Sequence, residues 1–151
     1  MWFAVLMHIL GVVVWVGGMF FAHQILRPVA AELLAPPQRL PLWAGVFRRF
    51  FPVVWVSVLM ILSSGLYMIM LLGGFKAIAL SIHLMFGIGL VMTFVFCFVY
   101  FIPYGKLSRA VAAQEWKQAG EALATIRKLI GINLSLGLVS IAIAVVGRIA
   151  G

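Results

Sequence analysis

The sequence predicts an all-α integral membrane protein, an antiparallel bundle of four transmembrane helices with a cytoplasmic amphipathic helix before the fourth. Hydrophobic residues make up 66% of the 151 residues and charged residues only 9%, whereas soluble domains are about 45–50% apolar. The chain contains four uncharged runs that are long enough for the roughly 20 residues a helix needs to cross a bilayer. Lys and Arg gather between alternate runs.

The four spans are expected at about 2–26, 51–75, 77–103 and 129–149. The third ends at Pro103, which cannot continue the backbone hydrogen bonding of a helix. The first lacks the basic start and the small-residue cleavage site of a signal peptide, so we expect it to remain as a span. Together the spans and their connections form a single membrane domain, 1–151.

The connections 27–49 and 104–128 lie on one side of the membrane in this topology. Three prolines interrupt the first connection, at 36, 37 and 41, so we expect a short helix there, followed by a turn. The second connection is rich in alanine and has charges at helical spacing. It is therefore predicted to form an amphipathic helix that continues into the fourth span.

The distribution of cations predicts the orientation. Only Lys76 and Arg148 lie at the other side. The two connections hold the remaining nine of eleven, namely Arg27, Arg39, Arg48, Arg49, Lys106, Arg109, Lys117, Arg127 and Lys128. Because loops rich in Lys and Arg stay in the cytoplasm, we expect a bacterial inner-membrane protein with both termini in the periplasm. The same rule accounts for the excess of cations, so no nucleic-acid partner is expected.

Two histidines, His8 and His83, lie inside apolar runs and have no carboxylate nearby in the sequence. Counting inward from the outer ends, at 1.5 Å per residue, puts both about 10 Å deep. A neutral imidazole there needs a partner, because an unsatisfied polar group in hydrocarbon costs several kcal/mol. Two histidines at equal depth on separate helices suit the axial positions of a haem iron. His23, near the cytoplasmic end, is interpreted as an interfacial polar residue.

The surroundings of these histidines suit a large flat cofactor such as haem b. Glycines at helical spacing would let the ring approach the backbone, aromatic residues would line its edge, and outer cations would pair with the propionates. The predicted cofactor-binding residues are His8, His83, Gly11, Trp15, Gly87, Tyr67, Arg148 and Lys76, with the two histidines as metal ligands. The second span adds Ser63, Ser64 and Gly65 as small or polar neighbours. Helix packing is the alternative role for the glycines.

Copper is the alternative cofactor. The chain contains eight methionines, and thioethers together with imidazoles suit Cu(I). Met68 or Met70 could complete a copper site with both histidines. Methionine is also a common filler of apolar interiors, so the number of methionines alone does not decide between the two cofactors.

Three segments carry a family resemblance. HILGVVVWVGGMFF, residues 8–21, resembles the first span of CopD-type copper-resistance proteins and of the related HemJ-type protoporphyrinogen oxidases. IHL around His83 is similar to their second histidine motif, and residues 115–136 are typical of small CopD-like proteins. The resemblance implies a four-helix membrane bundle and, from the HemJ-type relatives, a b-type haem held by His8 and His83. HemJ-type proteins carry a lysine where this chain has Met85, which argues against porphyrinogen oxidation.

The sequence therefore favours a membrane haem b protein that transfers electrons or takes part in a redox step with quinol, a periplasmic oxidant or a porphyrin. A haem-dependent oxidoreductase is the only enzyme class it suggests. The alternatives are transport of copper or haem, with a periplasmic redox or copper protein as partner, and a structural subunit without a cofactor. The protein is expected to be surrounded by the lipid bilayer, and the sequence allows homo-oligomerisation.

Overall fold

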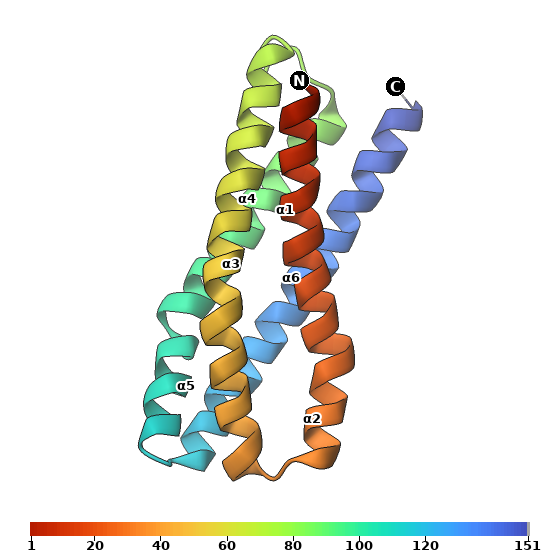
Figure 1. Cartoon of the computed structure of the whole chain (residues 1–151). Helices are drawn as coiled ribbons and strands as arrows, with labels where there is room; N and C mark the ends of the chain where they lie inside the picture. The colour runs from red at the N-terminus through yellow and green to blue at the C-terminus, as the bar shows by residue number, and fades with distance from the viewer. Residues whose placement is uncertain (151) are drawn as a thin grey trace.

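The computed structural model describes residues 1–150, and over that range it consists of helices joined by turns, with no strand (Figure 1). The elements in chain order are α1 (Trp2–Phe20), the π-helical turn η1 (Phe21–Leu26), α2 (Arg27–Leu33), α3 (Pro36–Leu71), α4 (Leu80–Phe101), α5 (Pro103–Ala112) and α6 (Trp116–Ala150). The expected all-α class is confirmed. The second connection is not one helix that continues into the fourth span: the amphipathic α5 ends at Ala112, a short turn follows, and the rest of the connection forms the start of α6.

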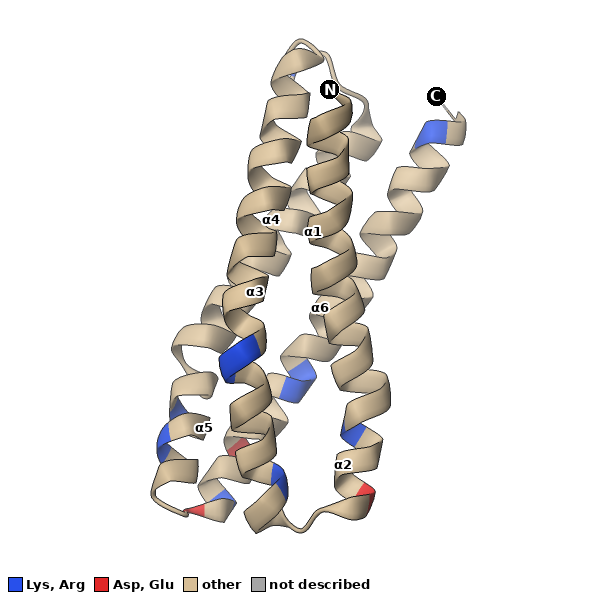
Figure 2. Cartoon of the chain, viewed as in Figure 1, with Lys and Arg blue, Asp and Glu red and all other residues tan. Residues whose placement is uncertain are grey.

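Within the described residues, four continuous helical stretches are long and apolar enough to cross a membrane: Trp2–Leu33, Pro36–Leu71, Leu80–Ala112 and Trp116–Ala150. Their lengths of 32 to 36 residues correspond to about 48–54 Å at 1.5 Å per residue. Because the hydrocarbon core is only about 30 Å thick, the helices extend beyond it. The cations gather at the end formed by α2 and α5 (Figure 2), and both chain termini lie at the opposite end. The protein is thus a multi-pass membrane protein with antiparallel helices.

The first connection is shorter than the sequence suggested, because α3 begins at Pro36 rather than near residue 51. Proline suits the first helical position, where its missing N–H would have no partner in any case. Pro41 and Pro52 lie inside α3 and do not end it. Transmembrane helices tolerate proline because neighbouring helices and local adjustments compensate for the lost bond. Only residues 34–35 remain between α2 and α3.

The turn between α3 and α4 is built on glycine. Gly73 has φ +99° and Gly74 has φ +84°, a left-handed conformation that glycine adopts without steric cost. The turn delays the start of α4 to Leu80, whereas the uncharged run begins at 77. The shift matters for the site, because it places His83 on the first turn of α4.

The helices pack chiefly as two pairs, α1 against α3 and α4 against α6, with α5 also packed on α6. The core is aromatic and lies mainly in the inner half of the bundle, which we define as the half that contains α2 and α5; the outer half contains the chain termini. In the inner half Phe47 and Phe51 are stacked with ring centroids 4.9 Å apart. Met92 is the first buried residue of α4 and Gly137 the last of α6. The outer parts of these two helices therefore contribute nothing to the buried core.

A buried amide connects the second pair near its middle. Asn133 of α6 donates from Nδ2 to the Met92 carbonyl of α4 at 3.0 Å. Its Oδ1 is buried and has no hydrogen-bond partner among the described residues.

Candidate metal site in the outer half of the bundle

His8 lies half-buried on α1 and points toward α3. Its Nδ1 is 3.1 Å from the Ile61 carbonyl oxygen and 3.0 Å from the Ser64 hydroxyl. A carbonyl only accepts hydrogen bonds, so we assign the proton to Nδ1. Nε2 then carries the free lone pair. Metal-bound histidines are commonly held in this way, with the other ring nitrogen donating to a backbone carbonyl.

Gly65 of α3 makes room for this ring. A Cβ at Gly65 would lie 3.3 Å from His8 Cε1 and 3.6 Å from His8 Nδ1. Ser64 and Gly65 belong to the small, polar stretch that the sequence indicated on the second span. The Ile61 carbonyl could not have been identified in the same way, because every residue has one and only the register of α1 on α3 selects it.

His83 lies on the first turn of α4 and is exposed. Its Nδ1 donates to the Ala79 carbonyl of its own helix at 3.1 Å, which again leaves Nε2 with the lone pair. The ring centroid is 6.3 Å from that of Phe75 in the preceding turn. Both histidines therefore present the same nitrogen, but His8 is fixed by a neighbouring helix and His83 by a local bond.

The structure holds the two histidines on different helix pairs. Ser81 of α4 packs against Gly147 of α6, where a Cβ on the glycine would lie only 2.6 Å from Ser81 Oγ. His83 follows Ser81 by two residues and so lies on the other side of α4, since successive residues are rotated by about 100°. His8 lies six residues, or about 9 Å, along α1, and His83 lies three residues, or about 4.5 Å, along α4 at 1.5 Å per residue.

The other predicted cofactor residues divide into two groups. Gly11 and Trp15 are covered by protein: a Cβ at Gly11 would lie 3.1 Å from the Ser57 carbonyl oxygen, and Trp15 is 3% exposed. Four others are exposed, namely Tyr67, Lys76, Gly87 and Arg148. In this arrangement Gly11 and Trp15 serve helix packing, and the exposed four face the surroundings of the bundle.

The methionines near His8 differ in their placement. Met68 follows Ser64 by one helical turn and therefore lies on the same face of α3; it is half-buried. Met70 is 64% exposed. No group of three or more His, Cys, Asp or Glu side chains in residues 1–150 could hold a metal ion. A metal here would therefore depend on imidazole and thioether ligands.

His23, predicted as an interfacial residue, lies half-buried in η1. Its Nδ1 accepts a hydrogen bond from the Gln24 side-chain amide at 3.1 Å. On the opposite edge of the ring, a Cβ at Gly131 of α6 would lie 2.9 Å from His23 Nε2. His23 is thus seated against a glycine of a neighbouring helix, as His8 is.

Comparison with known proteins gives one result. The family model of copper resistance protein D matches residues 44–147, a range that includes His83 but not His8. No curated protein and no solved structure matches the chain. Because the matched range covers more than half of its length, the chain belongs to the CopD family of copper-resistance membrane proteins.

Proposed function

We propose that this CopD-family protein handles copper(I) in the outer half of the membrane, with His8 as the principal ligand. The observation that carries the proposal is the fixed orientation of His8. Its Nδ1 is hydrogen-bonded to α3, and Nε2 is the ring nitrogen left to bind a metal. Family membership favours copper over other metals.

The neighbouring chemistry supports the monovalent ion. Soft thioether ligands select Cu(I), and Met68 lies one turn outward from the serine that holds His8. An imidazole and a thioether are both neutral, so the empty site carries no charge in the hydrocarbon, where charges are costly, and the occupied site carries only the single charge of Cu(I). His83, which is exposed on the first turn of α4, would receive the ion before the half-buried His8.

The proposed orientation places the site toward the periplasm of a bacterial inner membrane. It is supported by the concentration of Lys and Arg at the end formed by α2 and α5 (Figure 2), because such loops stay in the cytoplasm. Copper arriving from the periplasm would then meet the outer end of the bundle first.

The test is anaerobic Cu(I) binding by the detergent-purified protein in competition with a chromogenic chelator. His8→Ala and Met68→Leu are expected to weaken binding by about tenfold or more, the range seen when metal sites lose supporting groups. His23→Ala and Met70→Leu are matched controls, and both should bind like the wild type. Unchanged affinity in His8→Ala would refute the proposal.

Haem b is the second candidate, and the shared orientation of the two imidazoles favours it. Nδ1 of His8 and Nδ1 of His83 each donate to a backbone carbonyl, as axial ligands of haem require. The donor set fits, with one imidazole from each helix pair. The outer part of α4 has no buried residue, so a large cofactor beside His83 would displace no buried side chain of that helix. Bound haem would supply one-electron redox chemistry.

An absorbance spectrum of the same preparation separates the candidates. A reduced b-type spectrum that disappears in His8→Ala and in His83→Ala supports haem. Stoichiometric copper without a Soret band supports the copper site.

A further inference from the structure

The cytoplasmic end of the bundle contains a cavity that the copper proposal does not use. Its volume is about 630 Å³, within the range of roughly 300–1,000 Å³ for ligand pockets. It is partly open, and four segments line it: η1, α2, the start of α3 and the start of α6. The π-helical turn η1 contributes His23 and Gln24 to its wall.

The charged groups of the cavity are all basic. Arg27, Arg39, Lys117 and Arg127 line it together with His23, and no acidic residue does so in the part of the chain described. Arg127 lies close enough to His23 and Arg27 for electrostatic repulsion. An anion bound between these side chains would relieve that repulsion.

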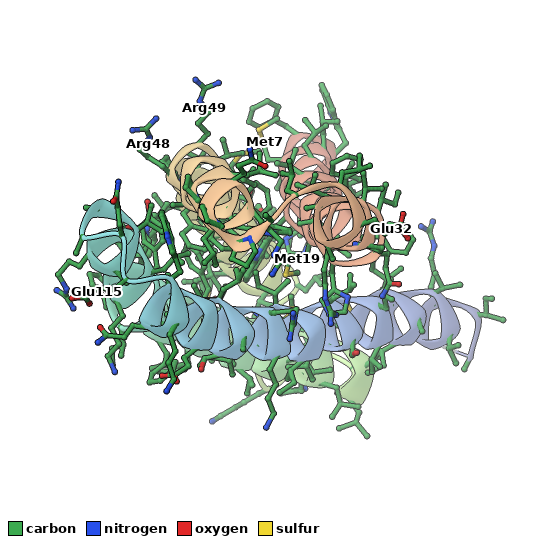
Figure 3. All side chains as sticks on the ribbon, turned by 90° about the horizontal axis from the view of Figure 1, so that it is seen from below. Met7, Met19, Glu32, Arg48, Arg49 and Glu115 are labelled. Carbon is green, nitrogen blue, oxygen red and sulfur yellow. The ribbon has the colours of Figure 1, made fainter. Side chains whose placement is uncertain are left out.

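The acidic residues of the chain do not supply this anion. The sequence has three, Glu32, Glu115 and Glu121, and all are exposed. Seen from the cytoplasmic end, Glu32 and Glu115 lie at the periphery of the bundle (Figure 3). Arg48 and Arg49 extend away from the helices in the same view, so they belong to the lateral surface of the bundle and not to the cavity.

The rest of the wall is apolar and aromatic. Leu40, Trp43 and Phe47 of α3 are buried there, and Trp116 and Ile130 come from α6. A site for a small, fully hydrated anion would not need such a wall. The combination suits a molecule with an anionic head and a hydrocarbon tail.

The level of the cavity in the membrane points to the same class of ligand. Arg27 closes the first uncharged run, and the fourth begins directly after Lys128. The cavity therefore lies where the spans leave the hydrocarbon, at the depth of the lipid headgroups. Tryptophan is enriched at this level, and basic pockets between helices on the cytoplasmic side bind anionic headgroups.

We propose that this cavity binds the phosphate headgroup of an anionic phospholipid of the inner leaflet. Arg39 and Arg127 are well suited to hold the phosphate, because guanidinium groups bind it with paired hydrogen bonds. The acyl chains would run along the apolar wall toward the hydrocarbon core. The proposal is independent of the copper site at the opposite end.

The experiment measures the thermal midpoint of delipidated, full-length protein in phosphatidylcholine bicelles, with and without phosphatidylglycerol. Phosphatidylglycerol is expected to raise the midpoint of the wild type. The rise should disappear in the double variant Arg39→Gln/Arg127→Gln. It should persist in Arg48→Gln/Arg49→Gln, which removes the same amount of charge from the lateral surface of the bundle. Equal loss in both double variants would indicate general attraction to an anionic surface and overturn the proposal.

Two further arms complete the test. Soluble glycerol phosphate, added without phosphatidylglycerol, should leave the midpoint unchanged; a rise matching that with the lipid would assign the site to a soluble phosphate and overturn the lipid. Lys117→Gln keeps the test decisive if the arginine variant does not fold. It should weaken phosphatidylglycerol binding about tenfold, as expected for a lost charged hydrogen bond, whereas Lys128→Gln, outside the cavity on the same helix, should not. Equal binding by both lysine variants would count against the site.

Discussion

The contact between α1 and α3 gives the sharpest prediction on stability. A methyl group added at Gly11 would lie 2.8 Å from Ile61 Cγ1 and 3.1 Å from the Ser57 carbonyl oxygen. The isoleucine side chain can rotate, but the carbonyl is fixed in α3. Gly11→Ala must therefore push the two helices apart by a few tenths of an ångström.

The magnitude follows from two opposing effects. Overpacking of this kind costs about 1–3 kcal/mol, and replacing glycine by alanine within a helix recovers about 0.8–1.0 kcal/mol. Gly17 is the matched control, because it lies on the same helix and a Cβ there meets nothing within 4 Å. Gly17→Ala gains only the helix propensity. The two variants should therefore differ by about 1–3 kcal/mol in free energy of unfolding, with Gly11→Ala the less stable.

The assay is reversible unfolding in mixed micelles, with sodium dodecyl sulfate as denaturant and circular dichroism as the signal. Using the difference between the variants cancels the uncertainty of helix propensities in detergent. If Gly11→Ala is as stable as Gly17→Ala, the described contact between α1 and α3 is wrong. The placement of His8 against Ile61, one helical turn from the same contact, would then be refuted as well.

Three other predictions concern the site and the core. Gly65→Ala should displace the His8 ring and weaken Cu(I) binding about tenfold in the chelator competition, while Gly45→Ala, where a Cβ meets nothing within 4 Å, should not. Cu(I) at a hundred times its dissociation constant should raise the free energy of unfolding by about 2.7 kcal/mol in the micelle assay, and His8→Ala should abolish the rise. Asn133→Leu removes one hydrogen bond to Met92, worth about 0.6 kcal/mol in membranes, but it also removes a buried unpaired oxygen, which is unfavourable. The two changes oppose each other, so the free energy of unfolding should change little. Asn133→Asp should cost about 2.5–3.5 kcal/mol; equal stability of the two variants would contradict the buried position.

The spans could be predicted from the sequence because lipid imposes strict rules. A backbone in hydrocarbon must satisfy its own hydrogen bonds, so an uncharged run of sufficient length has few alternatives to a helix. The ends of the helices follow weaker rules. Beyond the predicted span, α3 continues back through Pro41 to Pro36, since this part of the helix packs on other helices of the bundle and packing outweighs local propensity.

The site was predictable only in part. His8 could be found because an imidazole in a long apolar run needs a reason to be there. Its carbonyl partner could not, because that depends on the register between two helices. The expected equal depth of His8 and His83 relied on counting along a continuous helix from Lys76, whereas the glycine turn before Leu80 takes up several of those residues; the equal depth stays a prediction. Ligation by His8 and His83 stays a prediction.

The cavity at the end formed by α2 and α5 was not predictable for a related reason. Arg27 and Arg127 are a hundred positions apart, and the sequence explains both by membrane orientation alone. Only the antiparallel arrangement of α2 and α6 makes them neighbours. The same cations that indicate topology in the sequence line the proposed lipid-binding cavity in three dimensions.

The uneven distribution of the buried core has a mechanical consequence. Stacked aromatic rings hold together the half of the bundle that contains α2 and α5, whereas beyond Met92 and Gly137 the helices α4 and α6 contribute no buried residue to the interior. Regions with few buried contacts open at a small fraction of the global unfolding cost. The outer ends of α4 and α6 are therefore expected to separate from the bundle more easily than its other end does. They face the side from which we propose copper arrives.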